Sequence, residues 1–173
     1  AVDGGRWQGV VWKGDGAKFP SLGAAAGTGR ATSWRLAPTA LPRCERPSDP
    51  GEGYPFDMFQ QTALPLGFPL MLLHRTLDGA WYYAESSLAS GWVAAEDVAL
   101  ADETFQNAWR ALPLAAFTRD GVPPTDRTGN WLAAANLGTV LPLAGDEGSA
   151  LRLLTPVPDP AGPGVLSPAR VDT

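Results

Sequence analysis

The sequence predicts a mainly β chain, folded as two small antiparallel barrels that are joined by a short helix and preceded by an irregular N-terminal strap. Three observations predict this fold class. Short apolar stretches alternate with tight turns, the chain contains 20 Gly and 17 Pro, and the pattern of the first half recurs in the second half. Glycine and proline supply turn conformations and interrupt helices, so they favour short strands over long helices.

The composition indicates a folded chain without a strongly charged partner. Hydrophobic residues make up 45% of the 173 residues, and seven of them are Trp. Disordered segments are poor in such large aromatic side chains. The formal net charge is −5, whereas nucleic-acid-binding domains present a basic face, so no nucleic-acid partner is expected. No apolar run reaches the roughly 18 residues that a membrane-spanning helix needs, so no membrane span is expected.

The chain has one cysteine and one histidine, which limits its chemistry. Cys44 alone can form neither an internal disulfide nor a multi-cysteine metal site. A cysteine nucleophile needs a histidine partner or a helix N-terminus to lower its pKa, but Pro42 and Pro47 keep Cys44 out of a helix. His74 is interpreted as a strand-end residue. We therefore expect no catalytic residue, no metal and no cofactor in this chain.

Four segments are expected along the chain. Residues 1–30 form the irregular strap, in which residues 23–29 (GAAAGTG) are a linker and not a nucleotide loop, because the Lys-Ser/Thr ending of that loop is missing. Residues 31–99 form the first barrel. Residues 100–113 form the helical connector, and residues 114–173 form the second barrel.

Short strands separated by turns mark the first barrel. Asp78-Gly79 is a hairpin turn signal between two apolar stretches. Trp81 and Trp92 are interpreted as barrel core. Tyr82 and Tyr83 must point to opposite faces of their strand, so one of them is available for ligand contact. The expected strands are residues 33–36, 70–73, 81–85 and 92–94, and residues 56–62 are expected to form one helical turn.

The second barrel is predicted from a repeat. Four features recur in order: a Leu-Gly pair, an acid-Gly turn, an apolar strand and a strand that begins with Gly. They are Leu66-Gly67, Asp78-Gly79, residues 81–84 and Gly91-Trp92-Val93 in the first copy, and Leu137-Gly138, Glu147-Gly148, residues 150–154 and Gly164-Val165-Leu166 in the second. We expect residues 63–99 and 132–172 to superpose. Between them, residues 100–112 predict a helix that Asp102 caps.

The first copy resembles a bacterial SH3-like (SH3b) domain. The resemblance is carried by Leu66-Gly67-x-x-Leu70, Asp78-Gly79-Ala80-Trp81 and Gly91-Trp92-Val93-x-x-Glu96-Asp97-Val98. Over nearly its whole length, the chain is similar to the front portion of NlpC-type cell-wall cysteine peptidases, which place two such domains before a catalytic domain. The further matching segments are residues 53–57 with Gln60 and Gln61 before the first barrel, residues 117–123 at the start of the second, and the Trp7 and Trp12 region as a short stabilising segment.

The resemblance implies a non-catalytic role for this chain. The SH3-like pair would shape the substrate groove of a peptidoglycan stem-peptide hydrolase and aid cell-wall binding. A C-terminal NlpC-type catalytic domain would be its partner and would cleave the amide between D-Glu and the diamino acid. That domain brings an Asp-Cys-Ser motif and downstream histidines, which this chain lacks. The expected setting is the bacterial periplasm or cell envelope after export, with a monomeric chain.

The same resemblance implies substrate-binding residues. In such peptidases an acid and a tyrosine of the first barrel help to hold the free amino end of the stem peptide, since a carboxylate can pair with an ammonium group. Asp57 is the candidate acid, and Tyr54 and Tyr83 are the candidate aromatic residues. Many relatives have an aromatic residue directly before Gly-Trp-Val. This chain has Ser90 there, so Tyr54 or Tyr83 would have to take its place.

Two other functions remain open at this point. A free-standing cell-wall-binding module would bind peptidoglycan by itself, and a structural docking module would bind no ligand. A catalytic Asp-Cys-Ser motif beyond Thr173 in the parent gene would identify a peptidase. The surface that faces the wall is expected on the first barrel, because the second copy has mostly aliphatic residues at the corresponding places.

Overall fold

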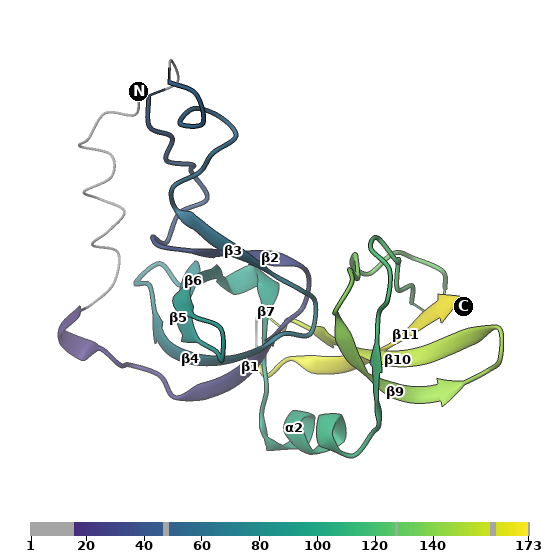
Figure 1. Cartoon of the computed structure of the whole chain (residues 1–173). Helices are drawn as coiled ribbons and strands as arrows, with labels where there is room; N and C mark the ends of the chain where they lie inside the picture. Colours follow the sequence, from purple (N-terminus) through teal and green to yellow (C-terminus); the bar gives the residue numbers. More distant parts are fainter. Residues whose placement is uncertain (1–15, 47–48, 127, 160–161, 173) are drawn as a thin grey trace. The chain divides into compact units, whose positions relative to one another are not determined.

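The computed structural model confirms the predicted fold class. Its described residues form antiparallel strands in two sheets, with one α-helix, α2 (Glu103–Arg110), among them (Figure 1). The Trp7 and Trp12 region, predicted to be a stabilising segment, lies outside the described residues. The structure describes residues 16–46, 49–126, 128–159 and 162–172.

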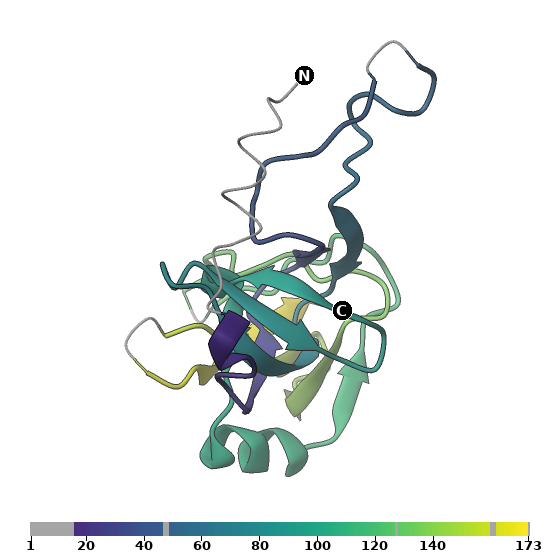
Figure 2. The same ribbon diagram turned by 90° about the vertical axis from the view of Figure 1, so that its left-hand side faces the viewer.

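The first sheet has the strand order β3-β2-β6-β5-β4-β1-β7. β5 and β6 form a hairpin whose pairs run from Trp81–Ala94 to Glu85–Ser90, and the chain between β2 and β3 projects away from both strands (Figure 2). The strands are β1 (Ala24–Thr28), β2 (Thr32–Arg35), β3 (Gln60–Leu64), β4 (Pro69–Arg75), β5 (Trp81–Glu85), β6 (Ser90–Ala94) and β7 (Val98–Leu100), with short 3-10 turns η1 (Gly16–Lys18) and η2 (Ala95–Asp97).

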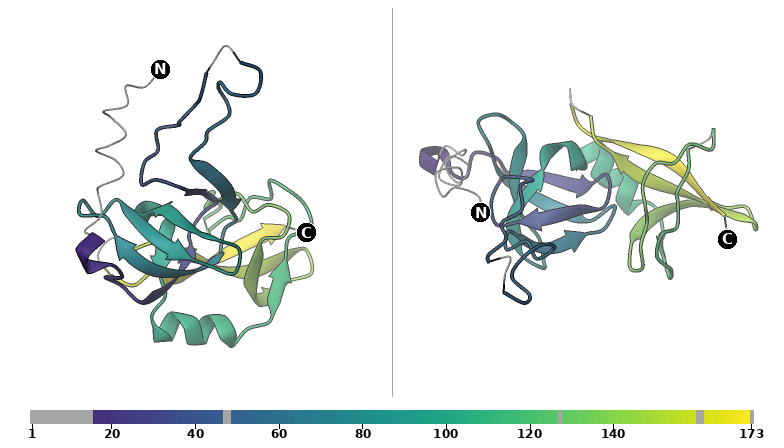
Figure 3. Two further views of the ribbon diagram at one scale, coloured as in Figure 1. Left: turned by 60° about the vertical axis from the view of Figure 1, so that its left-hand side comes forward. Right: turned by 90° about the horizontal axis from the view of Figure 1, so that it is seen from above.

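The second sheet has the strand order β11-β10-β9-β8. Its strands are β8 (Leu114–Ala116), β9 (Val140–Asp146), β10 (Ala150–Val157) and β11 (Val165–Asp172). β10 and β11 form a long twisted hairpin, drawn in yellow and yellow-green in Figure 3. The predicted helix cap is confirmed: the Asp102 carboxylate accepts a 2.8 Å hydrogen bond from the backbone N–H of Phe105 at the start of α2.

Contacts divide the chain into two compact units. In unit 1, Trp34 and Val93 are fully buried. In unit 2, the core is built around Leu66, Leu141 and Leu153. Of the described residues, unit 1 contains residues 16–23 and those of Ser33–Ala63 and Leu72–Ala95, and unit 2 contains those of Ala24–Thr32, Leu64–Met71 and Glu96–Thr173. The segment boundaries drawn from the sequence stay a prediction.

Residues 23–29 are not the linker that the sequence predicts, because they contain β1. Small residues have little intrinsic preference for strands, which is why the prediction was wrong. Their size is needed for close packing. A Cβ atom on Gly27 would lie 3.7 Å from the Pro156 side chain, and one on Gly29 would lie 2.5 Å from the Pro158 side chain. The helical turn predicted at residues 56–62 is also wrong, since β3 begins at Gln60.

Trp81 and Trp92 are not the buried core residues that the sequence predicts; among the described tryptophans, Trp34 is the one that is fully buried. Trp81 and Trp92 are only half-buried, because they lie on the outer face of the β5–β6 hairpin. The neighbouring Tyr82 is buried on the opposite face, as strand alternation requires. The prediction that Tyr82 and Tyr83 point to opposite faces is confirmed, and Tyr83 is the residue on the accessible side.

Candidate functional site

Four rings gather on the outer face of unit 1. Phe19, His74, Tyr83 and Trp92 form this group, which we call the Tyr83 ring cluster. The centroids of Tyr83 and Trp92 are 5.4 Å apart, and Phe19 lies 5.7 Å from Tyr83 and 5.6 Å from His74. The rings are tilted by 58° to 72° to one another, in the edge-to-face arrangement that aromatic quadrupoles favour.

The β5–β6 register brings polar groups beside these rings. Tyr83 lies opposite Trp92, and Glu85 lies opposite Ser90. The Tyr83 hydroxyl donates a 3.0 Å hydrogen bond to Oγ of Ser90. Glu85 is exposed and shares the face of Tyr83, because residues two apart in a strand point the same way. The site therefore combines ring faces, a phenol and an accessible carboxylate.

Buried His74 ties the segment of Phe19 to the sheet. His74 is only 4% exposed, and its Nδ1 lies 2.8 Å from Oγ of Ser21. The backbone N–H groups of Ser21 and Leu22 both donate to the carbonyl oxygen of Leu73, at 2.9 and 3.0 Å. His74 is the penultimate residue of β4, so the strand-end prediction is confirmed. Its role in this geometry is to position Phe19.

Asp57 lies in an ion pair outside the ring cluster. One carboxylate oxygen is 2.7 Å from the buried guanidinium of Arg35, and the other accepts backbone N–H groups of Arg43 at 2.8 Å and Phe59 at 3.0 Å. Burial opposes ionisation, but the two backbone donors and the guanidinium outweigh it, so the pKa of Asp57 is lowered. This carboxylate holds together the chain between β2 and β3.

Tyr54 lies in the same connection between β2 and β3 and is 89% exposed. No hydrogen bond or ring contact between described residues joins Tyr54 or Asp57 to Tyr83. Of the three predicted site residues, only Tyr83 belongs to the ring cluster. The sequence analysis missed Phe19, Ser21 and Glu85. The hairpin register could have found Glu85, since alternation from Tyr83 leads directly to it.

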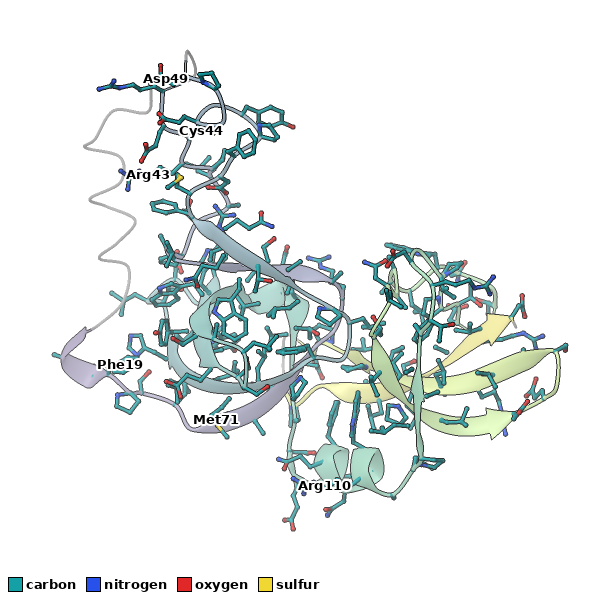
Figure 4. The ribbon with its side chains drawn as sticks, in the orientation of Figure 1. Phe19, Arg43, Cys44, Asp49, Met71 and Arg110 are labelled. Atoms are coloured by element: carbon teal, nitrogen blue, oxygen red, sulfur yellow. The ribbon has the colours of Figure 1, made fainter. Side chains whose placement is uncertain are left out.

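Cys44 is a half-buried free thiol. Figure 4 shows it beside Arg43 and near Asp49 in the projecting connection, well away from Phe19. Within the described ranges, no group of three or more His, Cys, Asp and Glu side chains is arranged to hold a metal ion. None of the helices in the described part of the chain has the length and apolarity to cross a membrane.

Comparison with known proteins identifies both halves of the chain. Residues 42–94 match the family model of the SH3 domain of SH3b1 type, and residues 102–146 match that of the SH3 domain of SH3b2 type. The chain is a pair of bacterial SH3b domains. The predicted resemblance is thereby confirmed. No curated protein sequence matches the chain.

Two solved structures share the fold of this SH3b pair. An NlpC/P60 endopeptidase from Photobacterium damselae subsp. piscicida is 26% identical with a TM-score of 0.82, over 96% of this chain and 37% of that one. An NlpC/P60 family protein from Bacillus cereus ATCC 10987 is 17% identical with a TM-score of 0.60, over 87% of this chain and 54% of that one. The SH3b pair therefore spans only part of each relative. Both of these structures are of NlpC/P60 proteins.

Proposed function

We propose that this SH3b pair forms one wall of the substrate groove of a peptidoglycan stem-peptide hydrolase, and that the Tyr83 ring cluster holds the free amino end of the peptide. The cluster itself carries the proposal. Phe19 is exposed, Tyr83 and Trp92 are half-buried beside it, and the exposed carboxylate of Glu85 lies on the same strand face as Tyr83. Ring faces attract ammonium groups, and a carboxylate pairs with them through a charged hydrogen bond.

The residues of the first domain divide into two roles in this proposal. Tyr83, Trp92 and Phe19 contact the ligand, and Glu85 accepts its ammonium group. Asp57, the acid that the sequence singles out, already has Arg35 and two backbone donors as partners. It orders the connection that carries Tyr54, whose exposed ring contacts the peptide at the rim of the groove.

The catalytic step belongs to a companion domain in this proposal. A C-terminal NlpC-type domain would supply a cysteine nucleophile and cleave the amide between D-Glu and the diamino acid. The likeness to an NlpC/P60 endopeptidase supports that partner. The setting is the periplasm or cell envelope after export, and the chain acts as a monomer. The 173-residue chain alone would have no amidase activity, because its single histidine is buried and places Nδ1 against Ser21, not against Cys44.

The proposal is tested by calorimetry with two forms of the tripeptide L-Ala-γ-D-Glu-diaminopimelate. The form with a free amine should bind the chain at least fivefold more tightly than the N-acetylated form, since acetylation removes the charge that Glu85 and the rings recognise. Tyr83→Ala and Glu85→Gln should remove this preference. Leu77→Ala is the control: it alters an exposed side chain of the same domain and should leave the preference for the free-amine peptide unchanged. Equal affinity for both peptides would contradict the proposal.

A further inference from the structure

A row of side chains crosses the outer face of the second sheet and continues onto the adjoining segment that contains Thr125 and Trp131. Thr125 pairs with both Trp131 and Arg170 through isolated antiparallel bridges. Arg170 pairs with Arg152 across β11 and β10. Directly opposed residues of antiparallel strands project from the same face, so Trp131, Thr125, Arg170 and Arg152 stand side by side. We call them the Trp131–Arg152 row. Gly145 on β9 pairs with Arg152 and ends the row.

The row is open to solvent, while the reverse of the sheet is core. Trp131 is 65% exposed, and the side chains of Arg152 and Arg170 are 58% and 49% exposed. Leu153 and Val171, which alternate with the arginines, pack into the core of unit 2. With strands about 4.8 Å apart, the row is roughly 19 Å long from Trp131 to Gly145. It has the dimensions of an extended ligand.

Local contacts constrain both ends of the row. Beside Trp131, the Asp126 carboxylate accepts the backbone N–H groups of Thr128 at 2.8 Å and Asn130 at 2.9 Å, which closes the turn. At the other end, the guanidinium of Arg152 lies over Gly145, where an added Cβ atom would come within 2.7 Å of it. The ligand-facing groups are therefore arranged before binding, which lowers the entropic cost of association.

Two neighbouring carboxylates compensate the positive charges of Arg152 and Arg170. Glu147 bridges the two guanidinium groups, at 3.2 Å from Arg152 and 3.2 Å from Arg170. Asp172 accepts a second hydrogen bond from Arg170 at 3.1 Å. Two cations and two anions thus form a neutral array of hydrogen-bond donors and acceptors, with a flat aromatic side chain at one end.

We propose that the Trp131–Arg152 row binds a glycan strand of the cell wall, with Trp131 stacked on the apolar face of a sugar ring. The guanidinium N–H groups donate to hydroxyl and N-acetyl oxygens of the following sugars, and the carboxylates of Glu147 and Asp172 accept from sugar hydroxyls. This inference goes beyond the peptide site of the first domain and takes from the proposed function only the cell-wall setting.

The chemistry of the row favours a neutral polyhydroxylated ligand over other partners. An anionic ligand would meet guanidinium groups whose charge is already compensated by Glu147 and Asp172. A protein partner that buries an apolar face would leave four charged side chains desolvated, which is costly. A sugar chain has both donors and acceptors along its length and apolar faces on its rings, so it matches the row from end to end.

The test is calorimetry of the 173-residue chain with chitohexaose and with peptidoglycan glycan strands freed of stem peptides. Both should bind. Trp131→Ala should weaken binding about tenfold or more, as expected of an aromatic anchor, and Arg152→Gln and Arg170→Gln each about threefold or more. Leu137→Ala is the matched control, because Leu137 is also 65% exposed and lies outside the row; it should bind normally. Circular dichroism checks the fold of each variant.

A second readout covers the case in which Trp131→Ala does not fold. The indole N–H resonance that is absent from the Trp131→Phe spectrum belongs to Trp131, and it should shift when chitohexaose is added to the unmodified chain. Tyr83→Ala should leave glycan binding unchanged, and Trp131→Ala should leave binding of the free-amine tripeptide unchanged, so failure of one proposal is distinguishable from failure of the other. Absence of glycan binding, or binding that Trp131→Ala and the arginine variants leave intact, would overturn the inference.

Discussion

The two SH3b domains share their turns and differ in what their hairpins display. Gly67 and Gly138 have φ values of 74° and 83°, and Gly79 and Gly148 have φ values of 70° and 79°, so the first two features of the sequence repeat have the same backbone geometry. Superposition of the complete copies stays a prediction. The outer face of β5–β6 carries aromatic rings, whereas that of β10–β11 carries paired charges. Glycines that shape the backbone recur, while exposed faces are free to diverge and to bind different ligands.

The third repeated glycine serves packing in both domains. A Cβ atom on Gly91 would lie 2.0 Å from the indole of Trp34, and one on Gly164 would lie 2.5 Å from the Cβ atom of Ala99. Real Cβ atoms do not approach so closely, so the neighbour or the backbone would have to move. The obstacle at Gly91 is a large buried ring, and the obstacle at Gly164 is the methyl group and backbone of Ala99 together with the carbonyl oxygen of Val157.

Gly91→Ala is expected to have the largest effect on stability. It should lower the free energy of unfolding by about 3 kcal/mol or more, and Gly164→Ala by about 1–3 kcal/mol, because overpacking displaces neighbours that cannot relax. Urea unfolding followed by circular dichroism measures both. Gly23→Ala is the control, since nothing lies within 4 Å of an added Cβ atom there. A loss for Gly91→Ala no larger than that for Gly23→Ala would refute this account of the core.

Asp57→Asn is expected to have the next largest effect. It leaves the buried guanidinium of Arg35 without its charged partner, which should cost about 2 kcal/mol at neutral pH, as expected for a hydrogen bond between charged groups. The folded-state pKa of Asp57 is lowered from an unfolded value of about 3.9. Its contribution is therefore present in full above that value and is lost as the pH falls through the folded-state pKa.

The pH dependence of stability distinguishes the ion-paired carboxylate of Asp57 from an exposed carboxylate. Unfolding in urea between pH 7 and pH 2 should show a smaller acid-induced loss of stability for Asp57→Asn than for the unmodified chain. Asp172→Asn removes a carboxylate that is largely exposed and should cost less than about 1 kcal/mol. If the two variants behave alike, Asp57 is free to accept a ligand, as the sequence resemblance implies.

Local signals in the sequence predict most of the fold. The strands at β2, β4, β5 and β6 and the cap of α2 follow from apolar patterns, the Asp78-Gly79 turn and Asp102. β1 could not be predicted in this way. Its Ala and Gly residues allow close packing against segments far along the chain, and no local sequence pattern indicates such contacts. Residues 70–73 are all apolar, yet Met71 is exposed while Leu70 and Leu72 are buried, so their apolar character alone does not report which face is covered.

The candidate site was less predictable, because it depends on contacts between distant parts of the chain. Tyr83 could be identified from strand alternation and the family resemblance. The contact between Ser21 and His74 joins residues 53 positions apart, and nothing in either segment indicates it. Asp57 was chosen as an acid in an exposed connection. Its ion pair with Arg35, 22 positions earlier, depends on the folded structure and could not be predicted from either segment.

Chemical-shift mapping of the ¹⁵N-labelled chain with the free-amine tripeptide tests the central claim most directly. The account predicts that the largest shifts fall on Phe19, Tyr83, Glu85 and Trp92 of the first domain, and that Arg152, Arg170 and Trp131 of the second domain stay unchanged until chitohexaose is added. Peptide-induced shifts confined to the Trp131–Arg152 row, with the Tyr83 ring cluster unaffected, would contradict it.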